Sequence, residues 1–340
     1  MIAGEPFDDV TIGVDIGGTK IAAGAVTPDD EIVARCHRPS PVDRLELEDA
    51  IVGVVTDIIG DLAQENGATG GRTVGPGQRV SAVGIGAAGW IDTRRDLIRF
   101  SPHLPWRDEP LAERLRDRLG LPVRVDNDAN AAAWGEYRHR LHVDPDQALP
   151  TAFLCLTLGT GIGGGLVLGG ELFRGAFGMA GEWGHMTVVP DGLVCACGHR
   201  GCWEQYCSGT ALTRGAHALV AERAPGSERL KAESVAGTLD GPTVTRLAED
   251  GDAACRVLLA ETGQWLGRGL ASLAAILDPD LIVIGGGVSR AGELILAPAR
   301  AAFAETLTGS GFRTPARIEL AGLGSDAGLV GAAGLARNLR

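Results

Sequence analysis

The strongest chemical signal in the sequence comes from three cysteines and one histidine. Cys195, Cys197 and Cys202 follow a C-x-C-x4-C spacing, and His185 precedes them. Three thiolates and one imidazole complete the tetrahedral ligand set of a structural zinc site, which has no open position for catalysis. We therefore expect these four side chains to hold one Zn²⁺.

Two alternatives stay open for this cluster. The cysteines would form disulfides in an oxidising compartment, but the acidic amino terminus has no signal-peptide pattern, which favours the reducing cytoplasm. His199 lies inside the same motif and would be an alternative ligand to His185. The remaining cysteines suit small buried positions: Cys36, Cys155, Cys207 and Cys255.

Glycine-rich turns form a second group of candidates. Segment 15–20 reads Asp-Ile-Gly-Gly-Thr-Lys and lies between two apolar runs. Its glycines would let backbone N–H groups face a phosphate, Thr19 would add a hydroxyl donor, and Asp15 would face Mg²⁺ or its water. A plain hairpin turn is the alternative interpretation.

Two further glycine segments follow in the second half of the chain. Segment 158–165 again separates two apolar runs, which favours a second phosphate-binding turn. A dinucleotide fingerprint would instead open a helix, and the chain has no P-loop pattern. The apolar run at 281–284 ends in Gly285–Gly287, which suits a base or ribose lying on the backbone, although helix packing would also explain these glycines.

A carboxylate suited to proton transfer follows the apolar run at 122–126. Asn127 and Asp128 lie at an expected strand-to-helix junction, where α/β proteins bind ligands. Asp128 would accept a hydroxyl proton there, or would only cap the helix. The residues alone leave both interpretations open.

The elements that must position these residues follow from the spacing of apolar side chains. We expect strands at 11–16, 21–26, 31–37, 80–86, 122–126, 151–157, 163–168, 281–285 and 317–321. We expect helices at 45–66, 109–119, 128–140, 203–222, 242–249, 252–277, 291–307 and from 325. Segments 66–79 and 223–241 are expected to be exposed loops. The pattern predicts a mixed α/β chain in which both halves begin with strands that turn at glycines, as in a duplicated lobe.

Length and charge narrow the class of protein. A chain of 340 residues exceeds the usual size of a single hydrophobic core, so two lobes are expected. The formal net charge of −12 opposes general binding to nucleic acid or to an anionic membrane. No apolar run reaches the roughly 18 residues that a membrane span needs. We therefore expect a cytoplasmic protein that binds anions only at local sites.

One stretch of sequence resembles a known family. Segment 178–185 reads GMAGEWGH, segment 195–204 reads CACGHRGCWE, and Ser208 follows. This stretch resembles the signature of the ROK family of sugar kinases and repressors, most closely that of its bacterial ATP-dependent glucokinases. The resemblance spans about 11–335. It implies an α/β, two-lobed, actin- and hexokinase-like (ribonuclease H-like) ATPase fold with a central ligand cleft and a small zinc-binding insertion.

The resemblance also implies a division of the chain. The N-terminal lobe would span 1–127, and the C-terminal lobe would span 128–324 with the zinc motif at 185–202. A terminal helix at 325–340 would return to the N-terminal lobe.

The same resemblance implies roles for individual residues. Asp128 would be the general base on the primary hydroxyl of a sugar. The other implied sugar contacts are Gly89, Asn127, Glu182, His185 and Glu204. The implied nucleotide contacts are Asp15, Gly17, Gly18, Thr19, Lys20, Thr160, Gly161, Gly285, Gly286 and Gly287. His185 would bind zinc through one ring nitrogen and face the sugar with the other, so that the metal fixes its orientation.

The implied reaction is phosphorylation of glucose at its 6-hydroxyl by Mg-ATP. N-acetylmannosamine and fructose are alternative substrates, because His103 stands where related kinases often have asparagine, and polyphosphate is an alternative donor. A sugar-responsive regulator without catalysis is a further alternative. Repressors of the family carry a DNA-binding domain ahead of the first phosphate motif, whereas 14 residues precede Asp15 here. A homodimer or homotetramer in the cytoplasm is expected.

Overall fold

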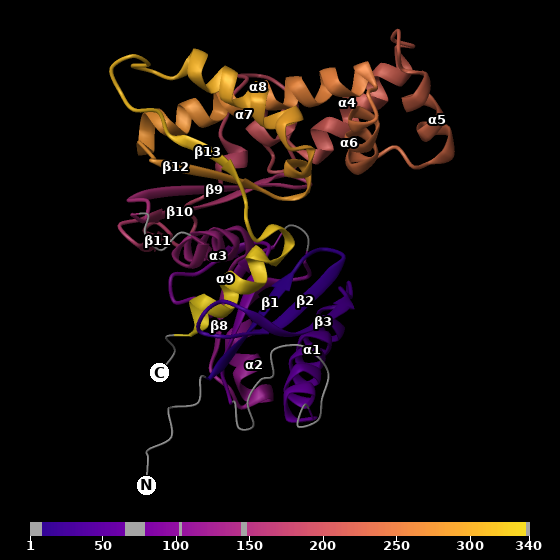
Figure 1. Ribbon diagram of the computed structural model, residues 1–340. Coiled ribbons are helices and arrows are strands. Elements are labelled where there is room, and N and C mark those ends of the chain that lie inside the picture. Colours follow the sequence, from indigo (N-terminus) through magenta and orange to yellow (C-terminus); the bar gives the residue numbers. More distant parts are fainter. Residues whose placement is uncertain (1–8, 65–78, 102–103, 144–147, 338–340) are drawn as a thin grey trace.

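The computed structural model describes residues 9–64, 79–101, 104–143 and 148–337 (Figure 1). Two five-stranded sheets lie at opposite ends of the molecule, with helices on their outer sides and two helices between them. Two separate hydrophobic clusters form the cores of the two ends. None of the helices in these described ranges is long and apolar enough to span a membrane.

The first sheet is built from the apolar runs of the first third of the chain. Its order is β3-β2-β1-β4-β8. The strands are β1 (Val10–Ile16), β2 (Lys20–Val26), β3 (Ile32–Pro39), β4 (Val80–Ala87) and β8 (Val123–Asn127). Strands β1, β2 and β3 are antiparallel neighbours, whereas β4 pairs in parallel with both β1 and β8. The carboxyl ends of β1, β4 and β8 therefore share one edge. Helices α1 (Arg44–Gln64) and α2 (Leu111–Leu119) pack on this sheet.

The second sheet repeats this plan. Its order is β11-β10-β9-β12-β13, with three antiparallel strands followed by two parallel additions. The strands are β9 (Ala152–Leu158), β10 (Ile162–Leu168), β11 (Glu171–Phe173), β12 (Leu281–Gly285) and β13 (Arg317–Leu320). The helices of this half are α4 (Gly209–Ala221), α5 (Glu228–Ala236), α6 (Gly241–Glu249), α7 (Ala253–Leu277) and α8 (Glu293–Thr306). The matching order of the two sheets agrees with the predicted duplication.

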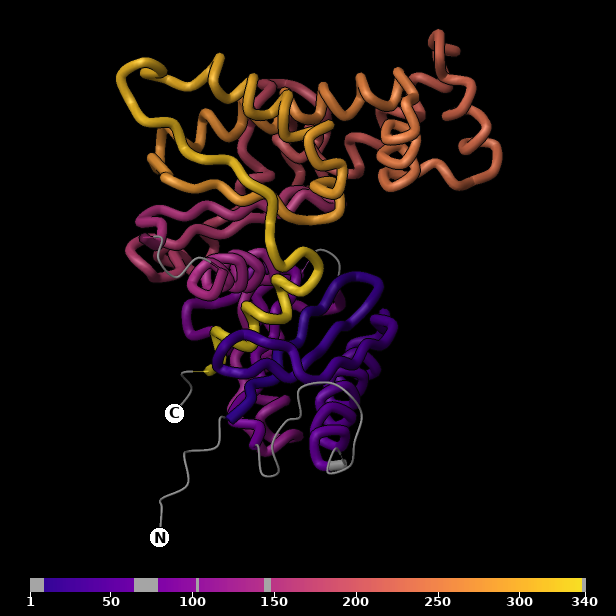
Figure 2. The backbone as a smooth tube through the Cα atoms, viewed as in Figure 1, coloured from indigo at the N-terminus to yellow at the C-terminus, as the bar shows by residue number. Residues whose placement is uncertain are grey.

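Two helices lie between the sheets, α3 (Asp128–Val143) and α9 (Ala327–Ala336). Figure 2 shows the last segment of the chain running from β13 back toward the first sheet. Helix α9 approaches its neighbours closely because small residues face each other: a Cβ at Gly13 of β1 would collide with the carbonyl of Leu329, and a Cβ at Gly331 would collide with that of Ala131 in α3. The backbones that carry the cleft residues are thus packed directly against one another.

The structure differs from the predicted elements in several places, among them strand β11, which was not predicted. Segment 223–241 was expected to be a loop but contains helix α5, whose Leu230 is buried. The predicted helix at 203–222 is interrupted: a short 3₁₀ turn covers Trp203–Gln205, and α4 starts after Ser208, whose hydroxyl accepts the N–H of Ala211. Ser208 is a strong helix cap, and it sets the start of α4 later than the apolar spacing predicts.

A small third sheet was not predicted. It consists of β5 (Trp90–Ile91), β6 (Ile98–Phe100) and β7 (Arg107–Glu109). The predicted helix at 109–119 begins later, at Leu111, because β7 occupies Glu109 and Pro110 precedes the helix. Strands of two or three residues carry too little apolar periodicity to be detected. The predicted loop at 66–79, apart from Arg79, and His103 lie outside the described residues.

Candidate active site

A cavity of about 180 Å³ lies between the two sheets and is also lined by α3 and α9. Asp15 reaches it from β1, Asp128 from the first position of α3, and Gly285 from the end of β12. The carboxyl ends of parallel strands collect ligand-binding residues at one edge of a sheet. The structure thus brings together the predicted base, the predicted magnesium-facing carboxylate and one predicted nucleotide-binding turn.

The pKa of Asp15, one of the carboxylates of this cavity, is strongly raised. Burial, and after it the nearby charge of Asp128, raise its pKa to about 7, although Lys20 partly opposes them. The start of α9 also packs closely against the Asp15 side chain, since a Cβ at Gly328 would lie 2.9 Å from its carboxyl carbon. A cation placed between Asp15 and Asp128 would relieve this repulsion.

The junction between β8 and α3 holds Asp128 in place. Asn127, rather than Asp128, caps the helix, because its Oδ1 accepts the N–H of Asn130 at 3.0 Å. The Nδ2 group of Asn127 donates to the carbonyl of Gly89 at 3.1 Å. Gly89 has φ +142°, and a Cβ there would collide with the carbonyl of Phe100, so only glycine fits at this close approach. Asp128 lies at the first position of α3, where its Oδ1 accepts the N–H of Ala129 at 2.9 Å.

The predicted sugar-binding carboxylates lie on either side of His185. Its Nε2 is 3.8 Å from Oε2 of Glu182, and its Nδ1 is 3.9 Å from Oε1 of Glu204. Burial raises the pKa of Glu182, and His185 partly offsets this effect while Asp128 adds to it. Glu182 is thus close enough to interact electrostatically with Asp128 across the cleft.

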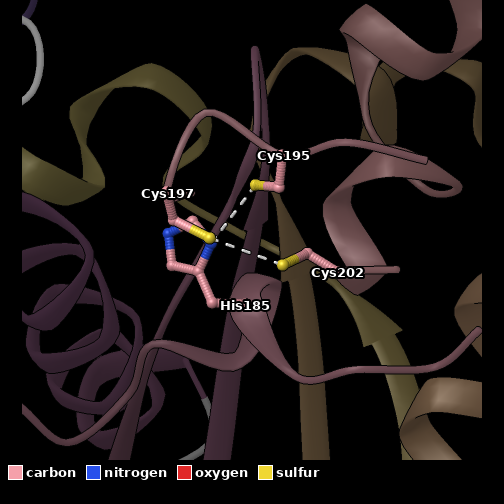
Figure 3. Close-up of side chains that lie close together, drawn as sticks. All are labelled: His185, Cys195, Cys197 and Cys202. Atoms are coloured by element: carbon pink, nitrogen blue, oxygen red, sulfur yellow. Dashed lines mark hydrogen bonds between the residues drawn. The ribbon is translucent and has the colours of Figure 1, made fainter. Parts of the chain in front are cut away.

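The four side chains predicted to bind a metal lie close together in the structure (Figure 3). The candidate ligand atoms of His185, Cys195, Cys197 and Cys202 all lie within 4.8 Å of one another. Sγ of Cys197 is 3.6 Å from Sγ of Cys202, and Sγ of Cys195 is 3.7 Å from Nδ1 of His185. With metal–sulfur distances of about 2.3 Å, the ligands of tetrahedral zinc lie about 3.8 Å apart. The donor set and its spacing fit a zinc ion.

The three thiols of the cluster differ in protonation, because burial raises the pKa of Cys195 to about 12 and also raises that of Cys202. The pKa of Cys197 is lowered to about 6: burial opposes the shift, and hydrogen bonds from His199 and the neighbouring thiols outweigh it. A thiolate is the form that binds zinc. His199 has Nδ1 3.7 Å from Sγ of Cys197, and it is not one of the four side chains that converge.

A second hollow of about 680 Å³ adjoins the glycine turns of the second sheet. Thr160, Thr210 and Gly287 line it together with the starts of α4 and α6. The N–H of Gly209 donates to the carbonyl of Gly159 at 2.8 Å, and the hydroxyl of Thr210 donates to that of Thr160 at 2.7 Å. Segment 285–287 therefore runs from the central cavity to this mostly apolar hollow.

The remaining predicted nucleotide contacts lie apart from both hollows. Gly17, Gly18, Thr19 and Lys20 form the turn between β1 and β2, which the N–H of Gly17 closes by donating to the carbonyl of Lys20 at 3.0 Å. Gly161 lies beside Glu204. The structure gives a hairpin geometry at 17–20, and this geometry is compatible with the phosphate-binding interpretation as well as with the plain turn.

Sequence analysis missed several residues that surround the cleft. Glu136 lines the central cavity from α3, and Thr157 and Ser325 line it from the second sheet and from the turn before α9. Glu136 stands eight positions after Asp128, a spacing that places both on one helix face. That spacing was visible in the sequence, but nothing in the local residue pattern marked Glu136 as buried.

The paired sheets, the cleft between them and the zinc-compatible cluster define an actin- and hexokinase-like protein with a small metal-binding insertion. The chain belongs to the ROK family, whose model matches residues 11–339. This finding confirms the resemblance seen in the sequence.

Individual relatives cover nearly the whole chain. Glucokinase from Streptomyces coelicolor is 42% identical over 336 residues, with 96% of this chain and 98% of the relative covered. N-acetylmannosamine kinase from Escherichia coli is 32% identical over 340 residues, with the same two shares covered. The crystal structure of a ROK family glucokinase from Streptomyces griseus in complex with glucose and AMPPNP is 43% identical, with a TM-score of 0.80 and coverage of 96% of this chain and 99% of that chain.

Proposed function

We propose that this chain is an ATP-dependent glucokinase, which transfers the γ-phosphoryl group of ATP to the 6-hydroxyl of glucose. The observation that carries the proposal is the central cavity, where Asp128 and Asp15 face Gly285 of the opposite sheet. The Streptomyces relatives support glucose and ATP as the substrates.

Asp128 acts as the general base in this scheme. Asn127 caps α3, and the Asp128 carboxylate, whose Oδ1 accepts the N–H of Ala129, lines the cleft at the start of the helix. It takes the proton of the 6-hydroxyl as the oxygen attacks phosphorus. Phosphoryl transfer depends mainly on alignment and charge neutralisation, and no covalent enzyme intermediate is needed.

Glu182, His185, Glu204 and Asn127 hold the remaining hydroxyls of the sugar, with the backbone of Gly89 beside them. Carboxylates, an imidazole and an amide are suited to hydroxyl groups because together they donate and accept hydrogen bonds. The proximity of Glu182 to both His185 and Asp128 supports placing the sugar between these groups.

The nucleotide lies along the glycine turns. The adenosine occupies the apolar hollow beside Gly287, and the phosphates extend past Thr160, Gly161, Gly285 and Gly286 toward the turn at 17–20. The continuity of segment 285–287 between the two hollows supports this path. Asp15 fits a Mg²⁺ ion or its water, because it is a half-buried carboxylate that faces a second carboxylate. Mg²⁺, when bound with ATP, supplies neutralisation of phosphate charge.

A zinc ion held by His185, Cys195, Cys197 and Cys202 has a structural role. Nδ1 of His185 faces the thiol of Cys195, and Nε2 faces Glu182. Metal binding at Nδ1 would fix the ring orientation and leave Nε2 for the sugar.

Closure of two lobes around the ligands completes the scheme. We assign 1–127 to the first lobe, 128–324 to the second, and 325–340 to a terminal segment that returns to the first. The burial of Ala133 and Tyr137 of α3 against Phe153 supports a boundary at 127/128, and the packing of Leu329 of α9 on Gly13 of β1 supports the return. A cytoplasmic homodimer or homotetramer completes the proposal.

An assay of sugar-dependent ADP release tests this function. Glucose, mannose, fructose and N-acetylmannosamine are compared with Mg-ATP as donor, and polyphosphate is tested in place of ATP. We expect the highest kcat/KM with glucose and ATP. If no sugar stimulates ADP release, the proposed kinase activity is wrong. A higher kcat/KM with N-acetylmannosamine would instead make that sugar the substrate, as the name of the Escherichia coli relative suggests.

A further inference from the structure

A buried ion pair lies directly beside the proposed catalytic base. Asp126, two residues before Asp128, is 3% exposed. Arg174, which follows β11 of the second sheet, places Nη2 2.6 Å and Nε 3.0 Å from Oδ2 of Asp126. The guanidinium thus joins the end of β8 to the end of β11 by charge-assisted hydrogen bonds, which are among the stronger polar contacts in proteins.

Other groups fix Asp126 from the side of the first sheet. Its Oδ1 accepts the backbone N–H of Asn127 at 3.0 Å. Nη1 of Arg95 lies 4.0 Å from Oδ2, and the carbonyl of Arg95 accepts the N–H of Val125 at 3.1 Å. The position of Asp126 is therefore set by β8 and by the hairpin that contains Arg95, and Arg174 is the contact that comes from the second sheet.

Arg174 also begins the loop that carries the proposed sugar contacts. Its carbonyl accepts the N–H of Ala180 at 3.0 Å, which closes the loop on itself. The loop then leads to Glu182 and to the 3₁₀ turn Trp183–His185. A Cβ at Gly178 would lie 2.5 Å from the carbonyl of Ile91, so the loop contacts the small third sheet closely.

We propose that Arg174 is a positioning residue for the sugar side of the reaction. By tying the start of the 175–182 loop to the residue next to Asn127, it sets the distance between Asp128 on one side and Glu182 and His185 on the other. Arg174 itself does not touch the sugar. This inference rests on the proposed sugar-binding role of Glu182.

A purely structural role would give a different result. An ion pair that only stabilises the fold would affect the two substrates equally or not at all. A positioning role acts on one substrate, because the hollow beside Gly287 for adenosine lies away from the 175–182 loop. The ratio of the effects on glucose and ATP therefore separates the two roles.

The test variant is Arg174→Lys, which keeps the positive charge and removes the planar two-donor geometry. The matched control is Arg140→Lys: Arg140 is also 22% exposed and pairs with Glu319 at 2.6 Å, away from the sugar loop. We expect Arg174→Lys to raise the KM for glucose about tenfold, as expected for loss of one well-aligned contact, with the KM for ATP changed less than about twofold. Arg140→Lys should change neither.

Two further variants make every outcome informative. Glu182→Gln should raise the KM for glucose; if it does not, the proposed sugar site is wrong, whatever Arg174→Lys does. If Glu182→Gln raises the KM and Arg174→Lys does not, or if Arg174→Lys changes the KM of both substrates equally, the positioning role is overturned. If Arg174→Lys does not fold, the double variant Asp126→Asn/Arg174→Gln removes both charges together, and it should fold and show the same selective loss of glucose affinity.

Discussion

The half-buried Asp15 and the buried Asp126 are two carboxylates at the same edge of the first sheet, and their surroundings differ. Asp126 is held by the guanidinium of Arg174, whereas Asp15 faces the second carboxylate of Asp128 and has a raised pKa. A buried charge that is paired stabilises a fixed geometry, whereas a carboxylate that faces a like charge is relieved by taking up a proton or by binding a cation. The first arrangement fits a residue that organises the site, and the second fits a residue that binds a ligand.

The largest expected effect lies in Asp128, which touches the reacting hydroxyl in the proposed mechanism. Asp128→Asn should lower kcat by about 10²–10⁴, the usual contribution of a positioned general base, while glucose still binds. ADP release and glucose binding by calorimetry measure the two quantities. Asp126→Asn is the matched control on the same strand end, and it should reduce stability and glucose affinity with a much smaller change in kcat. Equal losses of kcat in the two variants would remove Asp128 from the role of base.

Asp15 should respond to substitution in a direction opposite to Asp126. The folded pKa of Asp15 is about 7 and its ordinary value is 3.8, so ionisation costs folding free energy that grows as pH rises between these values and is constant above them. The cost is at most about 4 kcal/mol. Asp15→Asn should therefore raise the melting temperature of the ligand-free protein at pH 8, with a smaller gain at pH 5, and weaken binding of Mg-ATP.

Thermal melts of Asp15→Asn and Asp126→Asn at pH 8 and pH 5 test this contrast between the two carboxylates. Asp126→Asn should lower the melting temperature at both. A lower melting temperature for Asp15→Asn at pH 8 would show that Asp15 is paired in the folded protein, and the contrast between the two carboxylates would fail.

The candidate metal cluster offers a third case, in which one cation would hold several thiolates together. Cys197→Ser should release zinc, lower the melting temperature and raise the KM for glucose about tenfold, because His185 loses the ligand that orients it. Zinc content by mass spectrometry and glucose kinetics check this. Cys207→Ser is a control outside the cluster, since Cys207 is buried and is not a member of the ligand set. A zinc-free Cys197→Ser enzyme with an unchanged KM for glucose would separate the metal from the sugar site.

How far the sequence predicted this site depends on the kind of residue. The four candidate metal ligands were predicted because their spacing is local, and Asp15, Asp128 and Gly285 were predicted because each lies at or just beyond the end of an apolar strand. Arg174 and Glu136 were not, since their partners lie 48 and 186 residues away along the chain. Such contacts depend on how the two sheets are placed, which residue periodicity does not determine. Helix α5 was missed for the opposite reason, because its mostly polar surface concealed a single buried leucine.

The smallest expected effect concerns Glu136, a buried carboxylate whose charge is stabilised by backbone groups. Its two oxygens accept the N–H groups of Gly322 at 2.8 Å and Leu323 at 2.9 Å, which fixes the chain where it passes from β13 to α9. Glu136→Gln would turn an NH₂ group toward one of these donors and leave that donor without an acceptor, at a cost of about 1–3 kcal/mol. Because the same passage leads to Ser325 on the wall of the cavity, the KM for ATP should rise a few-fold.

Glu48→Gln is the control that separates stability from positioning. Glu48 is as buried as Glu136, at 1% exposure each, and it pairs with Arg44 and Arg114 in the core of the first sheet. Both variants should unfold at lower temperature, but only Glu136→Gln should change the KM for ATP. If the two variants lose stability equally and have the same KM for ATP, Glu136 contributes only to folding. A change in the KM for ATP in Glu136→Gln alone would give Glu136 the same kind of role as Asp126. Both would be fully hydrogen-bonded carboxylates that hold the segments carrying Asp15 and Asp128.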